Sequence, residues 1–299
     1  MDKTPPLPDC DAPRTDNPLT FKDLHPKRFF FEAWRELDAE HLESTGPKHS
    51  PGLVAYIFSV VTISIILQEY IGTTDYFLEL IDFIDKTATD SYWLHTLLKP
   101  DGGTLRSWMI RSENYELFAL CYWAAWRVFG FLVIPLLSIK LHPGFRGRSL
   151  GFSFKGMRQH LWVYAVLFLP VFVAVVIVSF FPEFQRYYPF YSRAHESTAD
   201  FVIWESFYIA QFLSLEFFFR GYMIQPIRRE LGSGAIFAMM IPYVMIHIGK
   251  PMIECFAAII AGIVLGTLAM RTRSIWSGFL IHVSVALSMD LLSIWQKTR

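Results

Sequence analysis

The chain has 299 residues, of which 53% are hydrophobic and 18% charged, and its formal net charge is zero. A soluble domain has about 25% charged residues, so this composition predicts a polytopic membrane protein embedded in a lipid bilayer. Zero net charge gives no indication of a nucleic-acid partner. The three cysteines (Cys10, Cys121 and Cys255) have no paired spacing, which argues against a disulfide framework or a cysteine metal site.

The first region, residues 1–50, is predicted to be a cytoplasmic tail. Residues 1–26 are polar and proline-rich, which is typical of a tail without regular structure. Residues 27–46 carry aromatic side chains at helical spacing together with charges of both signs. This pattern predicts either a helix that lies on the membrane surface or a short cytosolic helix packed on the protein. An excess of Lys and Arg in the tail and alternate loops favours a cytoplasmic N-terminus.

The second region, residues 51–200, is predicted to contain the N-terminal transmembrane helices and interfacial segments. Residues 75–99 alternate acidic with apolar side chains, so they are expected outside the hydrocarbon core. Arg127 lies inside a predicted span, where it could extend to the interface, pair with a carboxylate or bind substrate; structural pairing is favoured. The predicted spans of this region lie near residues 52–68, 115–138 and 161–181.

The third region, residues 201–299, is predicted to be a C-terminal core of four helices. Together with the three earlier spans they give an all-α membrane bundle of seven helices, and the family resemblance described below would allow eight. The segment 235–248 is short and is followed by Gly249, Lys250 and Pro251, so it is expected to bend inside the membrane. The four spans lie near 201–224, 235–248, 252–270 and 275–295.

Ionisable side chains are concentrated in these last spans. A charge at the centre of a membrane helix costs at least roughly 2.5 kcal/mol on insertion scales, so such residues usually mark functional sites. Their number in one third of the chain predicts an intramembrane site. The residues are Glu216, Arg220, His247, Glu254, His282 and Asp290.

Glu216 and Arg220 are four residues apart and therefore share a helical face. An unpaired carboxylate in low-dielectric surroundings would take up a proton, whereas an adjacent arginine can hold it ionised. The pair is expected to have a structural role through Arg220. Glu216 is also a candidate for the base that activates a water molecule.

Two histidines stand deep in different spans. His247 follows Tyr243 by four residues, and His282 lies among aliphatic residues. Beside a carboxylate, one imidazole could transfer protons while the other stabilises a developing oxyanion. Two histidines and a glutamate could equally bind zinc or a related ion. The sequence requires no cofactor, and a divalent metal remains an open alternative.

Two further acids have more ordinary interpretations. Glu254 follows Pro251 in the first turn of a predicted helix, where the helix dipole favours an acid. Its nearness to His247 makes it a second candidate carboxylate. Asp290 lies roughly 12 Å along the same helix from His282, so it is expected to be a supporting or interfacial acid.

At these residues the sequence resembles the CPBP family, which groups CAAX prenyl endopeptidases with bacteriocin-processing and related bacterial membrane proteins. The family pattern is Glu-Glu-x-x-x-Arg, then Phe-x-x-x-His, then His-x-x-x-Asn. The corresponding residues here are Leu215-Glu216-x-x-x-Arg220, Tyr243-x-x-x-His247 and His282-x-x-x-Ala286.

The resemblance implies that the first glutamate and the first histidine activate water, and that the last histidine and asparagine form the oxyanion hole. Leu215 stands at the first glutamate and Ala286 at the asparagine. Leucine cannot take a proton, and alanine cannot donate a hydrogen bond. Glu216 is rotated about 100° from Leu215 on an ideal helix, so it could replace the base only after a change of helical register.

Three functions follow from these observations. The first is an intramembrane endopeptidase in which Glu216 or Glu254 replaces the base and His247 assists the attack of water. The second is a catalytically silent scaffold or regulator that binds a membrane peptide, and the third is a small transporter. The expected partner is a membrane-embedded or lipidated peptide or protein. The resemblance to the CPBP family also favours a location in a bacterial inner membrane.

Overall fold

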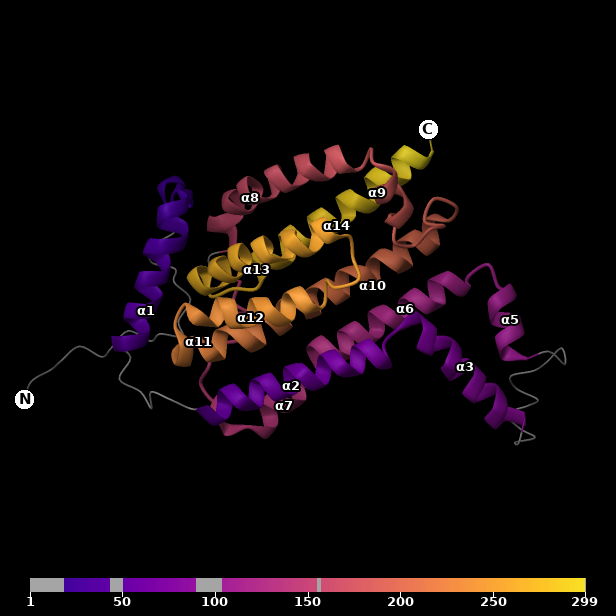
Figure 1. Cartoon of the computed structure of the whole chain (residues 1–299), viewed down its shortest axis with the longest axis horizontal. Coiled ribbons are helices and arrows are strands. Elements are labelled where there is room, and N and C mark those ends of the chain that lie inside the picture. Colours follow the sequence, from indigo (N-terminus) through magenta and orange to yellow (C-terminus); the bar gives the residue numbers. More distant parts are fainter. Residues whose placement is uncertain (1–18, 44–50, 90–103, 155–156, 299) are drawn as a thin grey trace, which may run out of the picture. The chain divides into compact units, whose positions relative to one another are not determined.

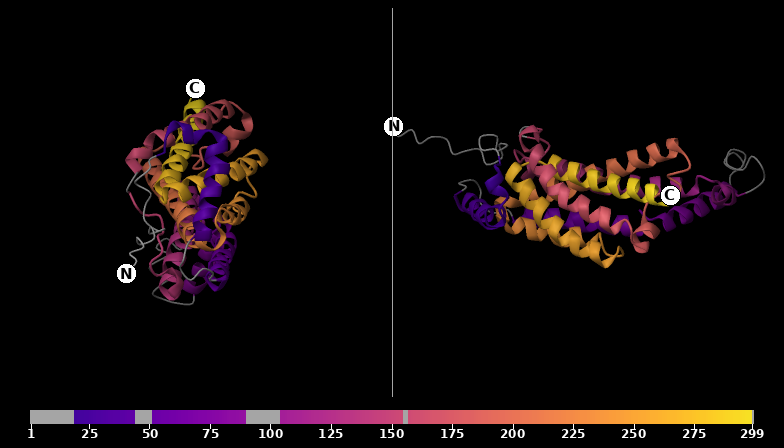
Figure 2. Two further views of the ribbon diagram at one scale, coloured as in Figure 1. Left: turned by 90° about the vertical axis from the view of Figure 1, so that its left-hand side faces the viewer. Right: turned by 90° about the horizontal axis from the view of Figure 1, so that it is seen from above.

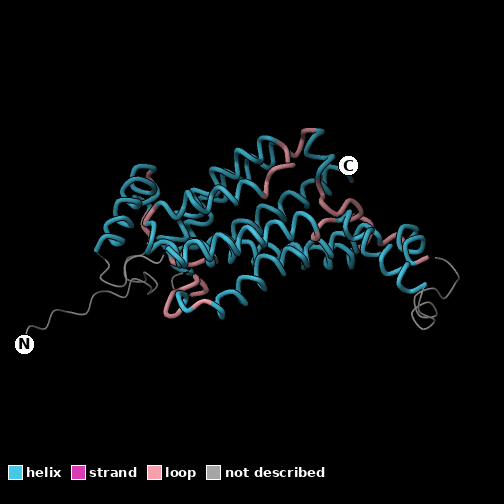
Figure 3. Tube along the Cα trace, turned by 60° about the horizontal axis from the view of Figure 1, so that its bottom comes forward, coloured by secondary structure: helices cyan, strands magenta, loops and turns pink. Residues whose placement is uncertain are grey.

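A computed structural model describes residues 19–43, 51–89, 104–154 and 157–298. These residues form helices joined by loops and turns, with no β-strand among them (Figure 3). Figure 1 shows the helices along the chain. In the first half they are η1 (Phe21–Leu24), η2 (Lys27–Glu32), α1 (Ala33–Glu43), α2 (Pro51–Tyr70), α3 (Thr74–Thr89), α5 (Leu105–Arg111), α6 (Tyr115–Val128), η3 (Phe129–Val133), α7 (Ile134–Leu141) and η4 (Pro143–Phe145). In the second half they are α8 (Met157–Val178), α9 (Pro182–Tyr187), α10 (Thr198–Glu216), η5 (Phe217–Ile224), α11 (Gln225–Leu231), α12 (Gly234–Met245), α13 (Met252–Thr272) and α14 (Trp276–Lys297).

Six helical segments of the described chain are long and apolar enough to cross a membrane, which confirms the all-α, multi-pass fold. The seventh predicted span corresponds to α12, which is apolar but has only 12 residues. At 1.5 Å per residue α12 is about 18 Å long, shorter than a hydrocarbon core of about 30 Å. The six longer segments are Gly52–Tyr70, Tyr115–Leu141, His160–Val178, Thr198–Leu231, Met252–Thr272 and Trp276–Lys297.

The chain forms two compact units, each assembled from three separate stretches of sequence. Unit 1 comprises residues Met1–Val61, Pro135–Val171 and Leu215–Ser284. Unit 2 comprises residues Thr62–Ile134, Phe172–Ser214 and Val285–Arg299.

In unit 1, α12 and α13 pack side by side (Figures 1 and 2), and α1 packs on the same unit. The indole of Trp34 donates to Thr267 at 3.1 Å and meets the ring of Phe237 edge-on. Asp38 accepts from the backbone N–H of Ser233 at 2.7 Å, just before α12 begins. These contacts show that α1 packs on other helices of unit 1.

The N-terminal segment differs from its prediction at residues 19–26. Leu19 is buried, and its N–H donates to His160 at 3.2 Å. Thr20 and Asp23 form a reciprocal capping box that starts η1. Residues 19–26 are therefore ordered, contrary to the prediction, because one apolar residue and one local cap fix the turn. Residues 1–18 lie outside the described part.

Unit 2 has an aromatic core around Trp204. This fully buried ring stacks on Phe190 and Tyr208, with centroids 5.7 and 4.9 Å away. Arg127, for which structural pairing was favoured, contacts an amide: its Nη1 donates to Gln68 at 3.0 Å, and the guanidinium lies over Trp123. Helix α3 fits the prediction of a non-spanning helix as far as Thr89, and residues 90–103 lie outside the described part.

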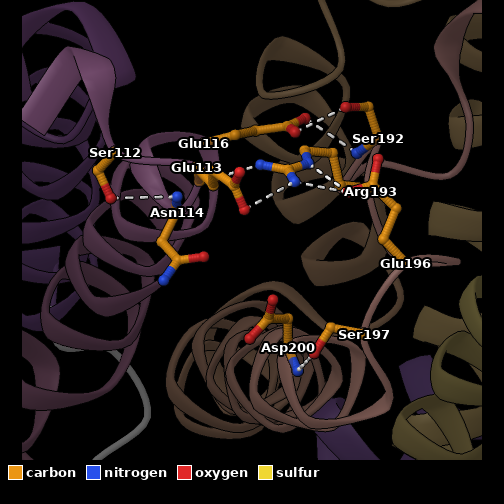
Figure 4. Close-up of polar contacts among 9 residues, drawn as sticks. All are labelled: Ser112, Glu113, Asn114, Glu116, Ser192, Arg193, Glu196, Ser197 and Asp200. Carbon is orange, nitrogen blue, oxygen red and sulfur yellow. Dashed lines mark hydrogen bonds and ion pairs between the residues drawn. The ribbon is translucent and has the colours of Figure 1, made fainter.

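A polar network attaches the loop before α10 to the start of α6, also within unit 2 (Figure 4). The Arg193 guanidinium lies 3.6 Å from Glu113 and 2.6 Å from Glu196. Glu116 accepts from the backbone N–H and the hydroxyl of Ser192 at 2.9 and 2.6 Å. The loop at residues 192–196 is thus held against the start of α6 by solvent-exposed ion pairs and hydrogen bonds.

We predict that Asp38→Ala destabilises unit 1 by about 1 kcal/mol, the usual cost of removing a side chain that caps a helix N-terminus. Thermal unfolding in detergent micelles would measure the change. Glu36→Ala, an exposed position on the same helix, is the matched control and should unfold like the wild type. Equal loss in both variants would contradict a capping role for Asp38.

The loop network should weaken in acid. The hydrogen bond from Arg193 lowers the pKa of Glu196 below its usual 4.5. A lowered folded-state pKa stabilises the loop above the ordinary value, and that contribution is lost as the pH falls through the folded-state pKa. The hydrogen-exchange protection of residues 192–197, corrected for intrinsic exchange rates, should therefore decrease when the pH is lowered below 4.5. Glu196→Gln should show a weaker dependence, and identical profiles would contradict the account.

Candidate active site

The site is built around Glu216, the last residue of α10, whose side chain has no exposed surface. Its Oε1 lies 3.1 Å from Nη1 of Arg220, which is equally buried. The same oxygen lies 2.6 Å from Nδ1 of His282 on α14. The predicted i, i+4 pair is therefore present, and a histidine 66 residues away in sequence joins it.

The helix changes its winding directly after Glu216. Residues Phe217–Ile224 form a π-helix, η5, that contains Arg220, and all eight residues are buried. Such π segments are rare and are often found at functional sites. The π segment begins after both Leu215 and Glu216, so these two residues keep the α-helical rotation of about 100° between them. Leu215 itself is a buried apolar side chain.

Gly278 makes the position of Glu216 possible. A Cβ atom at this residue would lie 2.0 Å from Oε2 of Glu216 and 2.6 Å from its carboxyl carbon. No side chain fits there, because the carboxylate rests directly against the backbone of α14. Among the described residues Oε2 has no hydrogen-bond partner. Gly278 was not predicted from the sequence, although it precedes His282 by four residues and so shares its helical face.

Tyr243 connects the two histidines. Its hydroxyl lies 3.0 Å from Nε2 of His282, and its backbone carbonyl lies 2.8 Å from Nδ1 of His247. The Arg220 guanidinium lies 4.3 Å from the centroid of the Tyr243 ring. One tyrosine, almost fully buried, therefore contacts three of the predicted site residues.

Glu254 lies apart from this cluster. Its carboxylate is 3.5 Å from Nζ of Lys250, and about a quarter of its side chain is exposed. The next residue, Cys255, places its Sγ 3.0 Å from the His247 carbonyl oxygen. Within the described part of the chain, His247 makes no hydrogen bond or ion pair with a carboxylate.

Asp290 belongs to unit 2. It accepts from the backbone N–H of Phe190 at 3.3 Å and from the Trp204 indole at 3.4 Å. Glu205, a buried acid inside the predicted span 201–224, lies beside it; sequence reasoning did not identify this residue, although its position within a span was a signal. Ala286 packs into the apolar core of unit 2.

The described residues contain no group of three or more His, Cys, Asp and Glu side chains that could hold a metal ion. The cluster that is present combines one carboxylate, one guanidinium, two imidazoles and one phenol. Such a set can orient imidazoles and transfer protons.

The fold and the site define an integral, multi-pass membrane protein with a buried polar cluster in its C-terminal helices. A family model described as Rce1-like, type II CAAX prenyl endopeptidase Rce1-like, matches residues 197–288, which include Glu216, His247 and His282. No curated protein and no solved structure matches the chain. The match confirms the resemblance to the CPBP family over residues 197–288, which are similar to the CAAX-type membrane proteases.

We predict that Gly278→Ala destabilises the protein by about 1–3 kcal/mol, the usual cost of an overpacked core. In an unobstructed helix the same change would be stabilising, so the sign of the effect reports the clash with Glu216. The midpoint of detergent unfolding would measure it. Gly234→Ala is the matched control, since the nearest atom to its new Cβ is 3.8 Å away. Unchanged or raised stability in Gly278→Ala would contradict the packing described here.

Proposed function

We propose that this chain is an intramembrane endopeptidase that hydrolyses a peptide bond of a membrane-embedded or lipidated substrate by attack of water. The observation that carries the proposal is the Glu216–His282 contact of 2.6 Å, together with the contacts of His282 and His247 to the same residue, Tyr243. A carboxylate that orients an imidazole within reach of a second proton-transferring group is the arrangement used in hydrolytic sites.

His247 is the better placed residue to activate water. A carbonyl oxygen only accepts hydrogen bonds, so Nδ1 of His247 carries the proton that it donates to Tyr243. The neutral ring then has its lone pair on Nε2, which makes no hydrogen bond within the described part of the chain. The side chain is partly exposed, whereas Glu216 is fully buried. A base needs contact with the water it deprotonates, so this proposal assigns that role to His247.

Glu216 acts through His282 in this proposal. The carboxylate accepts from Nδ1 of His282 and balances the positive charge that the ring carries when Nε2 also holds a proton. A protonated Nε2 could then donate to the developing oxyanion. Ala286 supplies no second donor, and one missing donor typically costs about 10²–10³ in rate. We therefore expect slow turnover.

One observation favours a second candidate, the silent scaffold that binds a membrane peptide. Both ring nitrogens of His282 already have partners inside the protein. A site whose groups are satisfied internally can bind a peptide without cleaving it. The transporter has no comparable support, since the sequence shows no internal repeat.

The test is cleavage of quenched-fluorescent peptides, prenylated and unmodified, by the purified chain in nanodiscs. We predict that His247→Ala lowers kcat by about 10²–10⁴, the usual contribution of general acid–base catalysis. His41→Ala is the control, because His41 contacts the Arg229 carbonyl in a different part of unit 1.

Two carboxylate variants identify the acid that matters. Glu216→Gln should reduce cleavage strongly and Glu254→Gln only slightly, because Glu216 contacts His282 whereas Glu254 contacts Lys250. The reverse order would assign the role to Glu254. Binding of a peptide without cleavage by any variant would contradict the endopeptidase and support the scaffold.

A further inference from the structure

His282 is engaged at both ends of its ring. Nδ1 lies 2.6 Å from the Glu216 carboxylate, and Nε2 lies 3.0 Å from the Tyr243 hydroxyl. An ionised carboxylate only accepts, so the proton of the neutral ring is on Nδ1. The lone pair on Nε2 then accepts from the Tyr243 O–H.

His247 also contacts Tyr243, but only one of its ring nitrogens is engaged. Tyr243 offers His247 its backbone carbonyl, which engages Nδ1 and leaves the opposite nitrogen without a partner among the described residues. Tyr243 thus contacts the two histidines with different groups. A side-chain substitution removes one contact and keeps the other.

The aromatic ring of Tyr243, which carries the hydroxyl, is packed on several sides. The ring is 1% exposed, and Arg220 lies 4.3 Å from its centroid. The Phe219 ring meets it edge-on, with the ring centroids 5.2 Å apart. The backbone of Gly262 lies so close that an added Cβ would be 3.3 Å from Cδ1 of Tyr243. A phenol packed in this way cannot swing aside without moving its neighbours.

We propose that Tyr243 caps His282, in the sense that the Tyr243 hydroxyl is hydrogen-bonded to the Nε2 atom that a reacting group would need. This hydrogen bond restrains turnover. The inference rests on the proposed endopeptidase function. For Nε2 to donate to an oxyanion, the hydrogen bond from Tyr243 must break and the nitrogen must gain a proton. Tyr243 is therefore a positioning residue that acts through His282.

Tyr243→Phe tests the cap, since phenylalanine keeps the ring and the backbone carbonyl and removes only the hydroxyl. We expect kcat for peptide cleavage in nanodiscs to rise about fivefold with KM unchanged, the factor that corresponds to one hydrogen bond of about 1 kcal/mol. Tyr222→Phe is the matched control: this tyrosine is also fully buried in unit 1, and its hydroxyl bonds Ser138 at 2.8 Å. A fall in kcat in Tyr243→Phe alone would overturn the cap, because the hydroxyl would then assist the reaction.

A second readout does not depend on activity. In ¹⁵N-histidine NMR spectra, Tyr243→Phe should shift the Nε2 resonance of His282 and leave His247 unchanged, and Tyr222→Phe should move neither. His282→Gln and His247→Gln assign the signals. An unchanged His282 resonance, or equal shifts at both histidines, would overturn the cap. If no variant cleaves any peptide, the proposed function fails while these spectra still decide whether Tyr243 caps His282.

Discussion

The burial of one carboxylate, Glu216, determines much of the surrounding structure. A charge without exposed surface must be compensated, and removing one partner of a buried pair typically costs about 3–5 kcal/mol. Arg220 supplies the opposite charge one helical turn away, and His282 supplies a hydrogen bond from α14. Gly278 supplies the space, because any side chain there would overlap the carboxylate. The C-terminal helices of unit 1 are therefore tied together by a polar group.

The same compensation limits what Glu216 can do. A carboxylate engaged by a guanidinium and an imidazole, and closed off from solvent, acts on a substrate through its partners. His282 and Tyr243 extend the cluster toward His247, which is partly exposed. Both histidines of the CPBP pattern are present, as His247 and His282. Of its two adjacent glutamates only the second is present, as Glu216, and Leu215 stands at the first. In the proposed mechanism, the group that deprotonates water is the imidazole of His247 and not a glutamate.

The sequence predicted what depends on local spacing. The i, i+4 pair of Glu216 and Arg220 and the apolar spans are encoded within single helices, so they were predictable. The contact between Glu216 and His282 joins residues 66 positions apart, and nothing in a helical repeat specifies which faces of two helices meet. The role of Gly278 depends on that same packing. Leu19 is a smaller example, since one buried side chain orders a segment whose composition is typical of a tail.

The most direct test of this account is a double-mutant cycle on Glu216 and His282. Free energies of unfolding would be measured in mixed micelles for Glu216→Gln, His282→Gln and the double variant. The account predicts a coupling energy of about 0.5–3 kcal/mol, the range found for residues in one buried network. Additivity of the two single changes would show that the carboxylate and the imidazole do not interact, and it would contradict the site described here.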